Sequence, residues 1–273
     1  MIRRLSVFVG VTVVLLMLES SCSRFRKIQK SEDWRVKYDA GLTYYEKKDY
    51  YHTAILFEEI LPVVRGLPEG EKVEFYLAYC QYYEKTYLLA SNQFKTFFET
   101  YGRSTLAQEA YFMYAYSLYV ASPASNLDQK SSVEAMDAMQ NYLNRYPESK
   151  FGEQATQVIV TCQEKLEKKG FDNAVQYLKQ KMYKAAVIAF DNFRSSFPDS
   201  HYLEQISYMK VEAEYKLANQ SFQKFQLERF TAVVTFYQEF VDNYPNSPYA
   251  KDAEKMYADS LEQINKLKPN KNS

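Results

Sequence analysis

Five residues of the chain carry a thiol or an imidazole, the side chains that most often act as nucleophiles, bases or soft metal ligands. They are Cys22, Cys80, Cys162, His52 and His201. Zinc sites need several such ligands at close spacing, and nucleophilic catalysis needs a base beside the nucleophile. These five are widely separated in sequence, and no HExxH, Cys-x-x-Cys, GxSxG, Walker or GxGxxG pattern occurs. The sequence therefore predicts no catalytic residues, no metal and no cofactor, and both histidines are expected at the surface.

Cys22 is the one cysteine whose surroundings predict a specific chemistry. Two arginines precede an apolar run of 14 residues (5–18), and Glu-Ser-Ser then leads directly to Cys22. The run is shorter than the ~20 residues that span a bilayer as a helix, and its layout is that of a secretory signal. Small residues before a cysteine resemble a bacterial lipobox, in which the thiol is acylated, although Glu19 stands where Leu is usual. We expect residues 1–21 to be a signal peptide and Cys22 the lipid anchor; an ordinary signal peptide with an incidental cysteine is the alternative.

The residues that follow Cys22 form the predicted tether, residues 22–33. Residues 23–30 carry four positive charges and no acid. This basic run is either a solvated spacer or is attracted to anionic headgroups, which contribute up to ~1 kcal/mol per charge near a surface. The relaxed lipobox resembles those of Bacteroidetes-like Gram-negative bacteria. Ser23 in place of Asp, and the lack of an acidic run, resemble outer-membrane lipoproteins that face the periplasm.

A short sequence motif recurs four times and predicts the architecture. It opens with an aromatic residue, continues with Pro or Gly, and has Ser at its fourth position; the copies start at Tyr101, Tyr146, Phe197 and Tyr244. Pro or Gly ends one helix and the serine is placed to cap the next. The structural residues of these turns are Gly102, Ser104, Pro147, Ser149, Pro198, Ser200, Pro245 and Ser247. A period of about 45 to 51 residues is typical of stacked helix–turn–helix repeats.

A second pattern lies upstream of each turn. At fixed offsets before the Pro or Gly, two large residues flank a small one at spacings of three and four, which places them on one helix face. The triplets are Tyr87, Ala90 and Phe94; Tyr183, Ala186 and Phe190; and Phe230, Val233 and Tyr237. A first copy, Tyr50, Thr53 and Phe57, precedes Arg65 in place of the Pro, and the third copy, Ser132, Ala135 and Met139, is degenerate. The fold predicted is an all-α, tetratricopeptide-like α-solenoid of about five helix–turn–helix repeats plus a C-terminal helix.

The repeats set the expected domain organisation. The repeat domain spans residues 34–267, with an enlarged loop at 121–132 inside the third pair and a polar break at 218–224 inside the fifth. Residues 268–273 are expected to be a disordered tail.

Composition narrows the classes of partner. The formal net charge of zero disfavours nucleic acid as a partner. The 26 Tyr and 18 Phe are expected mostly to pack between helices, with some available to grip an extended polypeptide. Cys80 and Cys162 lie in different repeats, so two separately buried thiols are favoured over a disulfide.

The lipid anchor and the long repeats together resemble the BamD family, lipoproteins of the outer-membrane β-barrel assembly machinery. The resemblance covers the mature chain and is clearest in the four turns and in residues 44–61, 131–151 and 165–200. It implies a non-catalytic scaffold that is anchored by Cys22 in the outer membrane and faces the periplasm. The alternative is a periplasmic repeat adaptor for envelope maintenance or nutrient uptake.

The resemblance also implies partners. Residues 200–267 are expected to bind a BamA-like barrel-forming subunit, alongside other subunits of the assembly complex. Residues 34–150 are expected to recognise segments of unfolded outer-membrane proteins. No short contact motif is present, so individual contact residues are not assigned.

Overall fold

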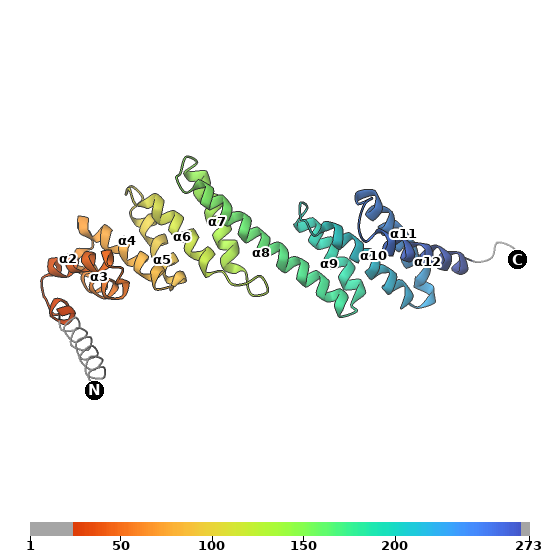
Figure 1. Cartoon of the computed structure of the whole chain (residues 1–273), viewed down its shortest axis with the longest axis horizontal. Coiled ribbons are helices and arrows are strands. Elements are labelled where there is room, and N and C mark those ends of the chain that lie inside the picture. Colours follow the sequence, from red (N-terminus) through yellow and green to blue (C-terminus); the bar gives the residue numbers. More distant parts are fainter. Residues whose placement is uncertain (1–23, 269–273) are drawn as a thin grey trace, which may run out of the picture. The chain divides into compact units, whose positions relative to one another are not determined.

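The computed structural model describes residues 24–268, and within this range the chain folds into helices without a strand (Figure 1). The major helices are α2 (Trp34–Glu46), α3 (Tyr50–Val64), α4 (Pro68–Tyr83), α5 (Tyr87–Thr100), α6 (Ala107–Ala121), α7 (Lys130–Arg145), α8 (Gly152–Lys179), α9 (Tyr183–Ser196), α10 (Leu203–Asn219), α11 (Gln223–Asn243) and α12 (Ala250–Leu267). From α2 to α7, and again from α9 to α12, each helix packs on the next one in the chain.

These helices form the five predicted pairs followed by one C-terminal helix. The pairs are α2–α3, α4–α5, α6–α7, α8–α9 and α10–α11, and α12 completes the array. The all-α, tetratricopeptide-like solenoid predicted from the repeat is therefore confirmed. The enlarged loop falls between α6 and α7 as expected, and the polar break coincides with the end of α10 and the start of α11.

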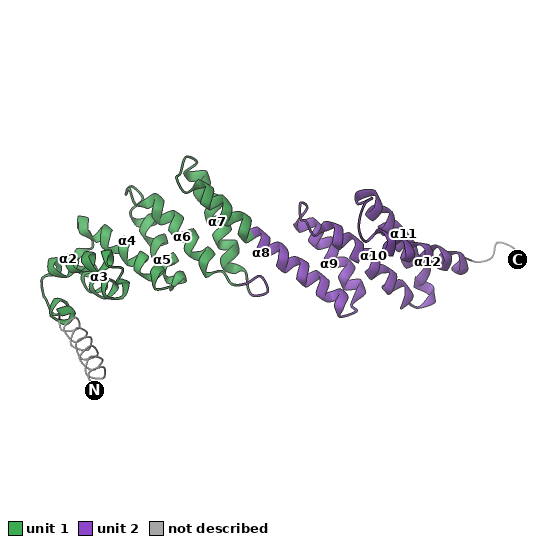
Figure 2. Cartoon of the chain, in the orientation of Figure 1, with its two compact units in different colours: residues 1–123, 128–162 green, residues 124–127, 163–273 purple. Residues whose placement is uncertain are grey.

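The described chain divides into two compact units, coloured separately in Figure 2. Unit 1 holds the described residues up to 123 and residues 128–162, and unit 2 holds residues 124–127 and the described residues from 163 onward. Helix α8 is continuous over 28 residues and passes from unit 1 into unit 2 after Cys162. The sequence predicted one domain over 34–267, and no linker-like composition marks this division.

The small residues of the upstream triplets lie in the core. Their side chains are completely buried at Thr53, Ala90, Ala135, Ala186 and Val233. The large residue four positions later is also completely buried in the first four pairs, at Phe57, Phe94, Met139 and Phe190. A small residue at each seam lets the neighbouring helix approach, so that the ring can fill the space between them.

The fifth pair departs from this pattern. Tyr237 is only half-buried and stacks on Tyr257 of α12, with ring centroids 4.3 Å apart. Phe240, one turn further along α11, is buried, as are the equivalent residues Ile60, Phe97, Tyr142 and Phe193 of the other pairs. Tyr237 thus packs between α11 and α12 at the edge of the core, because a single helix follows the last repeat.

A second recurring turn connects the two helices within a pair. Lys48, Lys85 and Lys181 adopt positive φ angles of 60°, 64° and 61° directly between paired helices. In each case a tyrosine opens the following helix two residues later. The left-handed conformation disfavours side chains with a Cβ, so these turns are held by the packing of the helices on either side.

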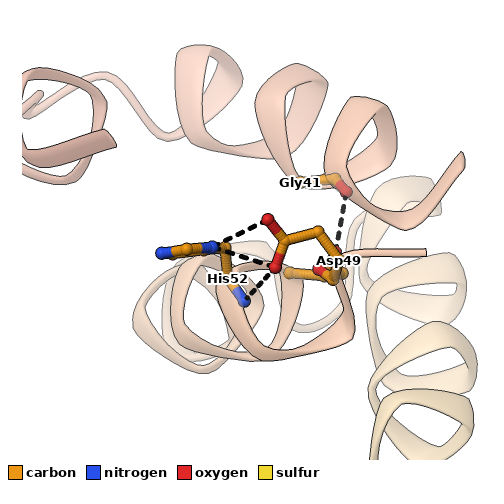
Figure 3. Close-up of polar contacts among 4 residues, drawn as sticks. Gly41, Asp49 and His52 are labelled. Atoms are coloured by element: carbon orange, nitrogen blue, oxygen red, sulfur yellow. Dashed lines mark hydrogen bonds and ion pairs between the residues drawn. The ribbon is translucent and has the colours of Figure 1, made fainter. Parts of the chain in front are cut away.

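Gly41 marks the closest approach of α2 to α3 (Figure 3). A Cβ at this position would lie 2.3 Å from the ring of Phe57, which is completely buried and cannot move aside. Thr53 Oγ1 donates a hydrogen bond to the Gly41 carbonyl over 3.3 Å at the same contact. Glycine is therefore required here by the space available, and not by its backbone angles.

We expect Gly41→Ala to destabilise unit 1 by ~1–3 kcal/mol relative to Gly152→Ala, because overpacking costs about this much. Gly152 is a matched control in the same unit, since a Cβ there meets its nearest atom at 3.9 Å. Urea unfolding followed by the fluorescence of Trp34, the single tryptophan and a residue of α2, measures the difference. Equal stabilities of the two variants would contradict this account of the α2–α3 seam.

Candidate functional site: surfaces for partner binding

The serine of each recurring turn makes the same hydrogen bond. Its Oγ accepts from the backbone N–H two residues later, over 3.0 or 3.2 Å, at Ser104, Ser149, Ser200 and Ser247. The following helices begin three residues after each serine, at Ala107, Gly152, Leu203 and Ala250. The serine caps the turn that leads into the helix, one turn earlier than the direct N-cap expected from the sequence.

The residue before the Pro or Gly ends the preceding helix in every copy. The backbone N–H of this aromatic residue donates to the carbonyl four positions earlier, at Tyr101, Tyr146, Phe197 and Tyr244. Pro147, Pro198 and Pro245 then stop the helix because proline has no N–H to continue it. Gly102 replaces proline in the first copy without a left-handed φ, so the serine is the element that all four turns share.

Two of these turns also connect to neighbouring helices. Ser104 Oγ bonds to the carboxylate of Glu71 on α4, and the hydroxyl of Ser149 bonds to that of Tyr142 on α7. The first turn lines an open hollow of about 570 Å³ together with Glu71. The Glu71 carboxylate already accepts the hydrogen bond from Ser104. The two groups therefore hold the turn in place and do not form a reactive pair.

The two histidines sit in different surroundings. The His52 ring bonds to Asp49, the N-cap of α3, over 2.8 Å (Figure 3) and contacts the ring of Phe25 in a tilted arrangement. His201 is exposed and lies 3.8 Å from the Glu167 carboxylate. In the described part of the chain no group of three or more His, Cys, Asp or Glu is placed to hold a metal ion.

Cys80 and Cys162 are both completely buried and are not joined by a disulfide. This confirms the preferred interpretation of two separate thiols. Burial raises the pKa of Cys80 to about 12, with the charges of Glu84 and Glu58 adding to the effect. The thiol therefore remains protonated at neutral pH and has little nucleophilic reactivity.

The tyrosines mostly pack between helices and extend their hydroxyls to the rim, as expected from composition. Tyr79 of α4 donates to the Glu109 carboxylate of α6 over 2.6 Å, and Tyr215 of α10 donates to Asp259 of α12 over 2.8 Å. Burial raises the pKa of both phenols, and the carboxylate each one bonds to raises it further. Each bond joins helices that are not consecutive in the chain.

Among residues 24–268, the most exposed large apolar side chain lies in unit 2, directly before α11. Phe222 is 80% exposed, and Ile188, Phe225 and Leu227 nearby in the same unit are also exposed. Ile188 and Phe225 line a hollow of about 410 Å³, the α9–α11 hollow, together with Lys184, Val187, Glu214, Leu217, Glu228, Arg229 and Ala232. Clusters of exposed apolar residues with a polar rim are typical of protein–protein contact sites.

Charged groups give the α9–α11 hollow its polar character. Glu214 is buried, and burial raises the pKa of its carboxyl against the opposing charges of Arg229 and Lys210. The Arg229 guanidinium bonds to Ser221 Oγ and lies over the Phe225 ring, 5.6 Å from its centroid. A rigid guanidinium beside an aromatic ring is a combination that is enriched at the energetic centres of interfaces.

Sequence reasoning missed this surface. Residues 218–224 were interpreted as a polar break, and the phenylalanine inside that break, Phe222, was the available signal. An aromatic residue in a short polar turn has no helix face to bury it, so its exposure is expected.

Cys22 and the signal peptide lie outside the described residues, as do residues 269–273 of the predicted tail. Among the described helices, none is both long and apolar enough to cross a membrane.

The raised pKa of Cys80 predicts slow alkylation in the folded protein. At pH 8, iodoacetamide should modify Cys80 at least roughly a thousandfold more slowly than in urea, because only the thiolate reacts. The measurement uses a chain with Cys22→Ser and Cys162→Ala, so that one thiol is counted. Rates within tenfold of each other would contradict a thiol held in the core.

Comparison with known proteins gives consistent results. A family model described as outer membrane lipoprotein (YfiO) matches residues 31–190, from before α2 into α9. The outer membrane protein assembly factor BamD of Rickettsia prowazekii (strain Madrid E) is 24% identical over 216 residues, which cover 78% of this chain and 80% of that protein. The match of the family model over more than half of the chain shows that this protein belongs to the YfiO family of outer membrane lipoproteins.

Proposed function

We propose that this protein is a non-catalytic scaffold of the outer-membrane β-barrel assembly complex, where it helps outer-membrane proteins to fold and insert. The observation that carries the proposal is the family match over residues 31–190, together with a relative named as an outer membrane protein assembly factor. The helical repeats agree with it, because stacked helix pairs present extended surfaces to other polypeptides. The exposed apolar side chains of both units support a role in binding.

Anchoring is proposed to occur through acylation of Cys22. The supporting observation is the position of this cysteine at the end of an apolar signal-like segment. Two or more acyl chains hold a protein stably at a membrane, whereas one chain is marginal. The mature protein would then be held at the outer membrane and face the periplasm.

The barrel-forming, BamA-like subunit is proposed to bind the C-terminal repeats, residues 200–267. The α9–α11 hollow supports this assignment, because Ile188 and Phe225 line it beside the guanidinium of Arg229. Phe222, three residues before Phe225, adds exposed apolar surface. Client segments are proposed to bind unit 1, within residues 34–150. Exposed apolar side chains there include Tyr51, Leu88 and Leu89, which suit transient contacts with an extended chain.

Replacement of Cys22 tests the anchor. We expect Cys22→Ser to abolish labelling by radioactive palmitate and to move the protein from the membrane fraction to the soluble periplasmic fraction. Ser21→Ala, a change next to the cysteine that keeps a small residue, should leave both properties unchanged. Membrane association of Cys22→Ser in detergent-free buffer would refute the lipid anchor.

Replacement of the exposed phenylalanines tests the partner. We expect the double variant Phe222→Ser, Phe225→Ser to recover at least about tenfold less BamA-like subunit after gentle solubilisation, as for loss of buried aromatic anchors. Tyr51→Ser in unit 1 is the matched control, since it removes an aromatic ring that is 62% exposed. Quantitative mass spectrometry identifies the recovered subunit. Recovery of a TonB-dependent porin without the barrel-forming subunit would favour nutrient uptake instead.

A further inference from the structure

The basic segment that follows the predicted lipid anchor is amphipathic and ordered. Residues 24–29 are helical, and Phe25, Ile28 and Gln29 turn inward with Phe25 only 9% exposed. Spacings of three and four residues place these three side chains on one face. The exposed positions of this N-terminal segment, residues 24–30, are Arg24, Arg26, Lys27 and Lys30.

Phe25 fixes the N-terminal segment to the first helix pair. Its ring lies 4.2 Å from the ring of His52 on α3 and 5.8 Å from that of Tyr44 on α2, measured between centroids. The His52 ring is itself held by Asp49, over 2.8 Å (Figure 3). The phenylalanine therefore rests on a preformed aromatic surface made by both helices of the pair.

A polar contact holds the other end of the N-terminal segment. Gln29 Nε2 donates to one carboxylate oxygen of Glu59 over 2.7 Å, and Lys37 Nζ donates to the other over 2.6 Å. Burial opposes ionisation of Glu59, but the bonds from Lys37 and Gln29 outweigh it and lower the pKa of this carboxyl. Glu59 thus joins α2, α3 and the N-terminal segment through one charged group.

The four cations on the exposed face, unlike Glu59, are not engaged in ion pairs within residues 24–268. Two acids follow the segment: Glu32 is exposed and is not ion-paired to any of the four, and Asp33 accepts from the Arg35 N–H as the cap of α2. Guanidinium and ammonium groups bind phosphate oxygens, and clusters of them next to a membrane attach to anionic lipids.

We propose that the N-terminal segment is a docked membrane-contact element, which presses the first helix pair against anionic phospholipid headgroups. The proposal rests on the proposed acylation of Cys22. Arg24 follows Cys22 by two positions, with only Ser23 between them, a reach of at most about 7 Å at full extension. Lipid, basic face and the α2–α3 pair then act as one body, and the segment is not a free spacer.

Vesicle binding of the unlipidated mature chain, starting at residue 22 with Cys22→Ser, tests the lipid contact. We expect it to bind vesicles of phosphatidylcholine with about one third phosphatidylglycerol at least tenfold more tightly than vesicles of phosphatidylcholine alone. Replacing Arg24, Arg26, Lys27 and Lys30 by Gln should remove this preference. The matched control replaces four exposed lysines elsewhere by Gln, at Lys72, Lys179, Lys251 and Lys268.

Equal binding to both kinds of vesicle, or an equal loss in the control variant, would overturn the lipid contact. Because the chain in this assay carries no lipid, its result is independent of Cys22 acylation. Loss of palmitate labelling at Cys22 is measured separately, so failure of the anchor and failure of this contact are distinguishable.

Hydrogen exchange tests the docking. In the wild-type chain we expect slow exchange at residues 24–30, and added protection of α2 and α3 when anionic vesicles are present. Phe25→Ala should speed exchange of the N-terminal segment in solution and lose the vesicle-induced protection of α2 and α3, while retaining the four charges and most of the vesicle binding. Phe225→Ala, in unit 2, is the control. Unchanged exchange in Phe25→Ala would overturn the docked arrangement.

Discussion

Each helix pair depends on a large side chain that packs against a small residue at the seam between helices. Phe57 shows the limit of this requirement, because its buried ring leaves no space for a Cβ at Gly41. Gly170 and the rings of Phe193 and Phe197 repeat the arrangement in unit 2, with a Cβ at Gly170 meeting Phe197 at 2.9 Å. Close packing at each seam sets the spacing of the helices, and the turns between pairs follow from it.

This construction also explains the character of the surface. A repeat buries its own seam and the face toward its neighbours, so residues outside those faces are free to serve partners. Phe222 precedes α11 and belongs to no seam, which leaves it exposed beside the α9–α11 hollow. The Cys80 thiol, in contrast, lies inside the core, where burial raises its pKa and keeps it protonated.

The N-terminal segment shows why part of the candidate site was beyond sequence reasoning. Its four cations are evident in the sequence, and they fit either a solvated spacer or a contact with lipid headgroups. Phe25 decides how this segment is held, but its partners His52 and Tyr44 are distant in sequence and come together only when α2 packs on α3. Likewise, nothing in the residue types of Lys48, Lys85 and Lys181 predicts a left-handed φ, since that conformation is imposed by the helices on either side.

The sequence by itself determined the all-α fold, the five pairs and the final helix, because aromatic, small and turn-forming residues recur at spacings that only stacked helices satisfy. It also indicated the burial of Cys80 and Cys162 and the family. The tertiary structure alone decided that the turn serines act one turn before the helix, that Tyr237 lies at the edge of the core, and that α8 joins two compact units. Local pattern fixes which elements form, whereas exposure and contact depend on which neighbours each side chain meets, and those neighbours come from other parts of the chain.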